Sequence, residues 1–177
     1  WTALGTVARQ PVPELMDGWI FQPGFPLVTA EGCGQELQLS QQRFTYLMQQ
    51  SVSEQLWQIP VQIRLVIGER TEHRRLLLTE RETTIGLPAG VTSVFVNEGG
   101  HGFYRVRHRG ALLQQLLDQG LDRLAAMERF NLISDAWATT LAGLMPLPEY
   151  LQLTARFKGE RDRNVWTVVL DSFSFLN

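Results

Sequence analysis

The chain has 177 residues, of which 44% are hydrophobic and 19% charged, and its net charge is −2 at pH 7. No apolar run approaches the roughly 18 residues that a membrane span requires, and the mild acidity gives no reason to expect nucleic acid or a membrane as a partner. Cys33 is the single cysteine, which excludes an internal disulfide framework and favours a reducing, cytoplasmic compartment. The chain begins at Trp1 without a methionine or a signal peptide and stops at Asn177 inside an apolar-periodic segment, so we expect a piece of a longer protein.

The first predicted element is a helix near the N-terminus. Pro11 and Pro13 are followed by Glu14, a pattern typical of a helix start, because proline is tolerated in the first turn and an acid stabilises the positive end of the helix dipole. Residues 22–26 should end this helix, since they contain two prolines and Gly24. A first strand is expected directly afterwards, over residues 27–30.

A series of short strands is predicted next. Leu37 and Leu39 alternate with polar neighbours, and residues 57–67 place apolar side chains at every second position, which is the clearest period-two pattern in the chain. Pro60 in that run lacks an N–H, so we expect it at an edge or a bulge. Further strands are predicted over residues 74–79, over 83–87 and from Thr92, with a long surface loop over 45–55. About seven or eight short strands predict an antiparallel β-sandwich.

A glycine-containing segment follows the strand that begins at Thr92. Gly99, Gly100 and Gly102 lie between two apolar runs, which predicts a tight β-hairpin whose second strand covers residues 103–107. From Gly110 onward the apolar spacing changes from two to three and four, so a helical region begins there.

Four helical segments are predicted in this second region. The first carries a leucine stripe and ends at Gly120, the second covers residues 122–141, and the third runs from Pro148 to Gly159. The fourth has Asn164 as its N-cap and an apolar stripe at Trp166, Val169, Leu170 and Phe173. Short loops between these helices predict α-helical hairpins that begin a larger array, so the fold class as a whole is α+β.

Six pieces of this sequence occur in an order that resembles the second half of an M1-family zinc aminopeptidase. They are Leu15-Met16-Asp17-Gly18-Trp19 with Gly24-Phe25-Pro26, Gln41-Gln42-Arg43-Phe44, Trp57 with Pro60, Gly102-Phe103-Tyr104-Arg105-Val106, Arg129 with Asp135, and Glu160 with Trp166. The resemblance implies three parts: residues 1–25 as the last helices of a thermolysin-like catalytic domain, 26–109 as a β-sandwich domain, and 110–177 as the beginning of a helical C-terminal domain. The leukotriene-hydrolase branch of the family lacks such a sandwich. Glu128 stands where relatives usually carry Asp, which leaves the charge unchanged.

The residues that carry the resemblance imply structural roles and no catalytic ones. We single out as structural motif residues Arg43, Phe44, Trp57, Pro60, Gly102, Tyr104, Arg105, Arg129 and Asp135. Arg105, Arg107, His108 and Arg109 form a basic cluster. Strand alternation sends Arg105 and Arg107 to the same face, which we expect to be solvated, although Arg105 could pair with a carboxylate across the joint between the domains. Arg129 and Asp135 interrupt an apolar helix, so we expect them to satisfy buried polar groups.

Catalytic and metal-binding motifs are absent from the sequence. A zinc peptidase of this kind needs His-Glu-x-x-His on a helix plus a more distant acidic ligand, whereas His73, His101 and His108 have no such spacing and Cys33 lies far away. There is no Gly-x-Ser-x-Gly elbow, and residues 99–102 lack the Gly-Lys-Ser/Thr ending of a phosphate loop. We therefore expect no catalytic residue, metal ligand or cofactor in this chain.

The resemblance implies a parent enzyme that uses zinc to release single residues from the N-termini of peptides. This chain would then be a non-catalytic scaffold whose partner is the remainder of the parent chain, and peptide would be a substrate of the parent only. The alternative is a protein-interaction module from a relative that lost its zinc ligands. A His-Glu-x-x-His motif about 200 residues upstream would distinguish the two.

Overall fold

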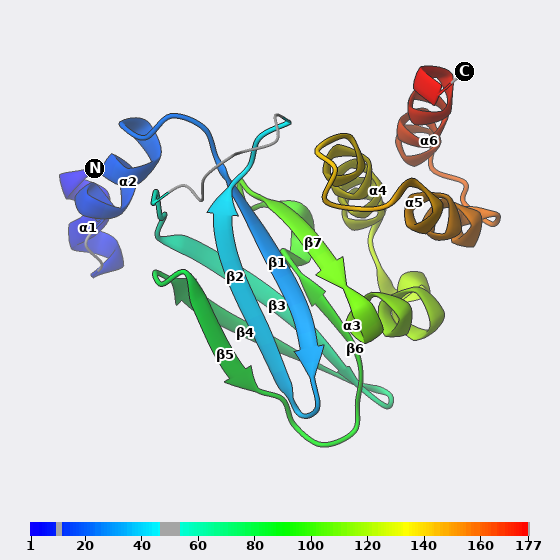
Figure 1. Ribbon diagram of the computed structural model, residues 1–177. Helices are drawn as coiled ribbons and strands as arrows, with labels where there is room; N and C mark the ends of the chain where they lie inside the picture. The colour runs from blue at the N-terminus through cyan, green and yellow to red at the C-terminus, as the bar shows by residue number, and fades with distance from the viewer. Residues whose placement is uncertain (10–11, 47–53, 177) are drawn as a thin grey trace.

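The computed structural model describes residues 1–9, 12–46 and 54–176 (Figure 1). In this part of the chain, seven strands form two facing sheets. One sheet has the order β5-β2-β1-β7, from Glu82–Gly86, Glu36–Arg43, Pro26–Cys33 and Arg105–Arg109. The other has the order β4-β3-β6, from Arg70–Leu78, Ile59–Ile67 and Val91–Val96. Helices precede and follow this sandwich, so the predicted α+β class is confirmed.

The sandwich core follows from the alternation in β3. Ile59, Val61, Ile63 and Leu65 are all at most 1% exposed, whereas Pro60 between them faces outward. Side chains at every second strand position point to the same face, so these four meet the inner face of the other sheet, where Val28, Leu37 and Leu39 are fully buried.

Pro60 lies in the middle strand of its sheet, opposite Leu77 of β4. On its other side β3 pairs with β6 only from Ile63 to Ile67. Pro60 is therefore beyond the end of β6, where its missing N–H removes no ladder bond to that strand. The expected edge position is correct locally, although the strand as a whole is central.

The hairpin predicted around the glycines is wrong. β6 and β7 belong to different sheets, and β7 pairs in parallel with β1, with Val28 opposite Val106. The glycine segment is a crossover between the sheets that contains the short 3-10 turn η1 (Glu98–Gly100). Asn97, Gly99 and Gly100 have φ of 67°, 76° and 72°, so the segment needs residues that tolerate the left-handed region, as a hairpin also would. One strand pair of the sandwich is thus not antiparallel.

Two N-terminal helices precede the sandwich. They are α1 (Thr2–Ala8) and α2 (Val12–Ile20), and α2 confirms the predicted helix, although Pro11 lies outside the described residues. The Trp19 indole N–H donates to the Gln58 carbonyl at 3.2 Å, which ties α2 to the sandwich. Most of the loop expected over residues 45–55 also lies outside the described residues.

The helical part lies beside β6 and β7 (Figure 1). It consists of α3 (Gly110–Gln115), the π-helical turn η2 (Leu116–Gly120), the 3-10 turn η3 (Leu121–Arg123), α4 (Ala126–Leu141), α5 (Leu147–Thr154), the 3-10 turn η4 (Ala155–Phe157) and α6 (Arg163–Leu176). The predicted leucine stripe is buried. No helix among the described residues is long and apolar enough to cross a membrane.

Two predicted helix starts are wrong. The second helix begins at Ala126 and not at Asp122, because residues 121–123 form a 3-10 turn and Leu124 is extended. Asn164 does not cap α6. Asp162 Oδ1 accepts hydrogen bonds from the backbone N–H groups of Asn164 at 2.8 Å and Val165 at 3.3 Å, so Asp162 performs the capping role predicted for its neighbour.

The apolar stripe predicted on α6 is only partly buried. Val169 lies in the helical core, whereas Trp166, Leu170 and Phe173 are 37%, 57% and 40% exposed. Tyr150 of α5 is fully buried, and its hydroxyl donates to Ser172 Oγ at 2.6 Å, which fixes α5 against α6.

Candidate functional site

The sandwich and the helical part meet along helix α4. On the sandwich side the contacts come from β3, from β7 and from the turn η1. We call this set of contacts the joint and define it by five charged residues: Arg64, Glu98, Arg105, Glu128 and Asp135. The two carboxylates on α4, Glu128 and Asp135, are both buried and both bind the sandwich.

Glu128 is the most enclosed group of the joint, with 1% of its side chain exposed. Its Oε2 accepts hydrogen bonds from Arg64 Nη2 at 2.7 Å and from the Ala125 N–H at 2.8 Å, and its Oε1 accepts the Gly99 N–H at 2.8 Å. Burial acts to raise the pKa of Glu128, but these three donors together lower it below its usual value. One carboxylate therefore closes the first turn of α4 and fixes β3 and η1 to it.

Asp135 makes the second set of hydrogen bonds between α4 and the sandwich, two turns further along α4. Its Oδ1 accepts from Arg105 Nη1 at 2.8 Å and its Oδ2 accepts the Val106 N–H at 2.9 Å. Burial raises the pKa of Asp135 to about 6, and the hydrogen bonds from Val106 and Arg105 limit the rise. The carboxylate holds both a side chain and a backbone N–H of β7.

Arg105 connects Asp135 to a group of aromatic side chains on the sandwich side. Its guanidinium lies 5.2 Å from the ring centre of Phe44 and 6.0 Å from that of Phe25, and these two rings stack on each other. A guanidinium over aromatic faces is attracted by their electron-rich π-systems. Phe103, which is 74% exposed, extends the aromatic group toward Trp19 of α2.

Glu98 completes the joint near its solvent side. It lies 3.6 Å from Arg64 Nη1, and it contacts His73 Nδ1 at 2.8 Å. Arg64 therefore lies between two carboxylates, one from η1 and one from α4. The His73 side chain is 62% exposed, so this outer pair is open to solvent screening.

The pair of Arg129 and Glu160 lies away from the joint, inside the helical part. Arg129 Nε and Nη2 donate to the two Glu160 oxygens at 2.6 and 3.0 Å, and Nη1 donates to the Leu124 carbonyl. The hydrogen bond from Arg129 lowers the pKa of Glu160 to about 2. The Trp166 indole N–H donates to the Glu160 carbonyl at 2.9 Å, so this group fixes the loop that enters α6.

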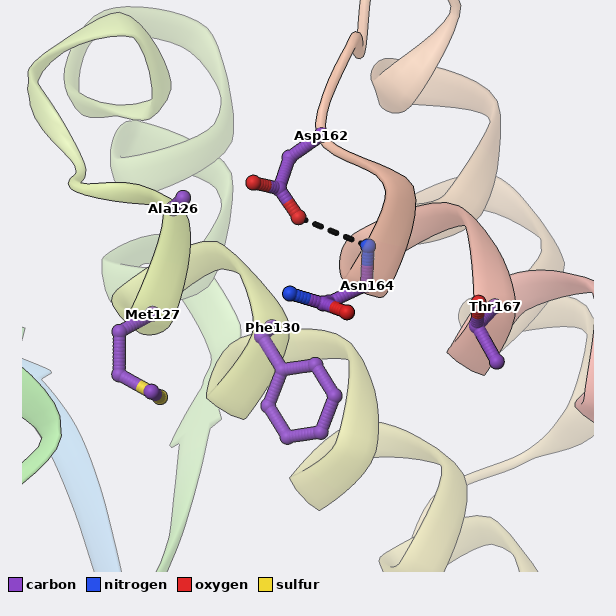
Figure 2. A pocket seen from close by; sticks show the side chains of 6 residues that line it. All are labelled: Ala126, Met127, Phe130, Asp162, Asn164 and Thr167. Atoms are coloured by element: carbon purple, nitrogen blue, oxygen red, sulfur yellow. Dashed lines mark hydrogen bonds between the residues drawn. The ribbon is translucent and has the colours of Figure 1, made fainter.

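A pocket of about 390 Å³ lies between the first turns of α4 and α6. In Figure 2, Phe130 of α4 and Asn164 of α6 lie on opposite sides of it. Asp162 and Thr167 supply its other polar groups, but the Asp162 carboxylate caps α6 and the Thr167 hydroxyl donates to the Arg163 carbonyl. These polar groups serve the first turn of α6, and they do not form a catalytic pair.

Comparison with known proteins gives one family match and several similar relatives. Residues 93–177 match the family model described as an ERAP1-like C-terminal domain. Over 99% of its length the chain is 31% identical to a puromycin-sensitive aminopeptidase of Caenorhabditis elegans, and over 77% it is 36% identical to a probable M1 family aminopeptidase of Encephalitozoon cuniculi. A glutamyl aminopeptidase of mouse is 28% identical over 99% of the chain. This chain belongs to the M1 aminopeptidase family. It spans 19%, 15% and 19% of the length of these three relatives.

The motif residues of this M1 chain lie in several separate places. Arg105 and Asp135 belong to the joint, and Phe44 packs under Arg105. Gly102 and Tyr104 flank Phe103 at the start of β7, and Arg43, at the end of β2, packs over Gly24. Trp57 and Pro60 belong to the sandwich, and Arg129 belongs to the helical part, so the structure does not bring all nine residues together.

The M1 family implies a zinc ion, but the described residues of this chain do not fit one. No group of three or more His, Cys, Asp and Glu side chains in that part of the chain could hold a metal. His73 pairs with Glu98, His108 is buried in β7, and Cys33 ends β1.

The sequence does not reveal the partners of Glu128 and Arg64 at the joint, or those of Gln41 in the sandwich. Glu128 was noted only for its departure from relatives, although an acid at the third position of a helix is a known capping signal. Arg64 has its partners Glu98 and Glu128 far away in the sequence, so no local pattern indicates them. Gln41 is 2% exposed, and its amide exchanges hydrogen bonds with the backbone N–H and carbonyl of Trp57 at 2.8 and 2.9 Å. No sequence pattern marks such a bridge, because its partners are backbone groups.

Proposed function

We propose that this chain is a non-catalytic scaffold within an M1 zinc aminopeptidase, and that its joint holds the helical C-terminal domain against the rest of the enzyme. The observation that carries the proposal is the pair of buried carboxylates on α4. Glu128 and Asp135 lie two turns apart, and each binds both a side chain and a backbone N–H of the sandwich side. Two such contacts, at separate points along α4, fix the direction of the helix, whereas a single contact would leave it free to pivot.

The domain limits proposed from the sequence fit this role. Residues 1–25 would be the end of the catalytic domain, 26–109 the sandwich domain and 110–177 the start of the helical domain. Arg105 supports this division, since it contacts Phe25, Phe44 and Asp135 from the three parts. The parent would remove N-terminal residues from peptides with a zinc ion held outside this chain. The single cysteine supports a cytoplasmic location.

The test is made in the full-length enzyme. Asp135→Asn keeps the shape of the side chain and removes its charge, so it weakens the hold on Arg105. We expect the zinc content and the hydrolysis of a small aminoacyl-p-nitroanilide to change little, whereas the kcat/KM for longer peptides changes more, because the helical domain then sits less firmly. Glu31→Gln, which weakens an exposed pair with Arg109, is the matched control.

Equal effects of Asp135→Asn and Glu31→Gln on peptide hydrolysis would contradict the role of the joint. A full-length protein without His-Glu-x-x-His, and without aminopeptidase activity, would favour the alternative, a protein-interaction module that kept the shape of the family.

A further inference from the structure

His108 of β7 occupies an unusual position at the joint. It is 3% exposed, and its Nε2 accepts the backbone N–H of Val96 at 3.2 Å. Val96 lies in β6, which is an end strand of its sheet, while β7 is an end strand of the other. The imidazole stacks on Phe95, with ring centres 5.4 Å apart and an angle of 16° between the planes. The ring therefore joins the free edges of the two sheets in a fixed orientation.

This hydrogen bond determines where the ring carries its proton. A neutral imidazole has one donor and one acceptor nitrogen, so an Nε2 that accepts requires Nδ1–H. Burial lowers the pKa of His108 to about 4, which keeps the ring neutral near pH 7. Nδ1 is buried, and among the described residues it has no hydrogen-bond partner. A buried N–H without an acceptor has lost its hydrogen bonds to water and gained none in return, so native proteins rarely leave one unpaired.

A small cavity lies next to the ring. Its volume is about 10 Å³, and it is lined by Phe95, Val96, Asn97, Val106, His108, Asn131, Leu132 and Asp135. A single water needs about 10 to 15 Å³ and two to four polar partners. The Asp135 oxygens each accept one hydrogen bond from the sandwich, and a carboxylate oxygen can accept a second. The Asn131 amide is a further polar group in the lining.

We propose that this cavity is a binding site for one ordered water molecule, which accepts Nδ1–H of His108 and donates to the Asp135 carboxylate. Asn131 supplies the third polar group. The water forms a further link between β7 and α4, in addition to the direct bonds of Asp135. It also gives the buried Nδ1–H of His108 an acceptor beside Phe95 and Leu132.

The test uses NMR on the 177-residue chain. A long-range ¹⁵N–¹H spectrum identifies the tautomer of His108, and cross-relaxation with water detects a molecule that stays beside Hδ1 for longer than bulk solvent. We expect the Nδ1–H tautomer and a water contact to Hδ1. The Nε2–H tautomer, or Hδ1 without a water contact, overturns the proposal.

Two variants separate the two sides of the ring. His108→Gln can keep an acceptor for the Val96 N–H but loses the Nδ1 donor, whereas His108→Asn can keep a donor toward the cavity but loses the acceptor. We expect the water contact to the Asn131 side chain to be lost in His108→Gln, with the Val96 amide still protected from hydrogen exchange. His108→Asn should show the reverse, and the same response in both variants would contradict a water held by Nδ1.

Discussion

Gly102 is enclosed by its neighbours at the start of β7. Its φ is not in the left-handed region, so the requirement for glycine comes from space alone. A Cβ at this position would overlap the Tyr104 ring and lie 2.8 Å from Asn97 Oδ1, which accepts the Gly102 N–H. The reason for the glycine is therefore different from the hairpin turn that the sequence suggested.

We predict that Gly102→Val destabilises the chain by about 1 to 3 kcal/mol, because the Tyr104 ring must move out of its buried position. Urea unfolding of both proteins measures the difference. Gly34→Val is a useful comparison, since Gly34 has positive φ but no neighbour within 4 Å of a Cβ and so tests backbone strain alone. An equal urea midpoint for Gly102→Val and the unsubstituted chain would show that the close neighbours of Gly102 do not affect stability.

His108 gives the stability a specific dependence on pH. Its pKa is about 4 in the folded chain and about 6.5 when unfolded, so between these values only the unfolded state binds the proton. Acidification through this window therefore destabilises the fold. Asp135 acts in the opposite sense, because its folded pKa of about 6 lies above its unfolded value and the folded state binds the proton first. The two effects partly cancel in the unsubstituted chain.

Comparing the unsubstituted chain with a His108 variant separates the effect of His108 on stability from that of Asp135. From pH 7 to pH 4, the unsubstituted chain should lose about 3 kcal/mol relative to His108→Gln, since one pKa unit corresponds to about 1.4 kcal/mol. Denaturant unfolding at several pH values gives both curves. Gln62→Ala serves as the control, because it removes no titrating group, and its curve should run parallel to that of the unsubstituted chain. Parallel curves for His108→Gln as well would mean that His108 is not buried in its neutral form.

For single residues, the sequence indicated a partner where two side chains of opposite charge pair with each other. Arg105 was expected to be able to pair with a carboxylate across the joint, and Asp135 was expected to satisfy polar groups within an apolar helix; the structure brings the two together. Glu128 and His108 were missed because most of their partners are backbone N–H groups. Those groups occur at every residue, so a sequence alone does not reveal which of them are left free.

The β3 strand shows what periodicity can establish at the scale of an element. Its alternation fixed which side chains face the core, and Ile63 is fully buried as expected. Periodicity did not establish whether β6 and β7 pair with each other. A hairpin and a crossover between sheets both need residues that accept positive φ, and both join two apolar runs, so the pattern of 94–106 is compatible with either.

For β3 we predict that Ile63→Ala costs about 2 to 5 kcal/mol, because it leaves a cavity between the sheets. Gln62→Ala should be nearly neutral, since the hydrogen bond from Asn97 N–H goes to the backbone carbonyl of Gln62 and survives the substitution. Equilibrium unfolding of the two variants provides the comparison. Similar losses at the two positions would mean that the register of β3 is wrong.

The contact between α4 and β3 can be measured as a coupling energy. In a double-mutant cycle with Arg64→Met and Glu128→Gln, we expect about 1 to 3 kcal/mol of coupling, because only 14% of the Arg64 side chain and 1% of the Glu128 side chain are exposed. The cycle for Arg109 and Glu31, which are 46% and 44% exposed, should give about 0 to 1 kcal/mol. A coupling at Arg64 and Glu128 no larger than this control would contradict the importance of the joint.

At the scale of the whole molecule, we predict that the chain neither binds zinc stoichiometrically nor cleaves aminoacyl substrates. A catalytic zinc needs about three protein ligands that converge on it, and no such group occurs in the part of the chain that the structure describes. Dialysis against zinc followed by mass spectrometry measures bound metal, and an aminoacyl-p-nitroanilide assay measures turnover, with the full-length enzyme as the positive control. One equivalent of chelator-sensitive zinc would direct attention back to His73, His101, His108 and Cys33.

The parallel pairing of β1 with β7 has a consequence for biosynthesis. β1 is among the first parts of the sandwich to leave the ribosome, and β7 is the last strand, with Leu27 opposite Arg105. Until β7 has been synthesised, one edge of β1 keeps its backbone groups unpaired and open to other chains. Completion of that sheet therefore has to wait for the residues just before α3, so a nascent chain closes its sandwich and acquires the strand that α4 binds in the same interval of translation.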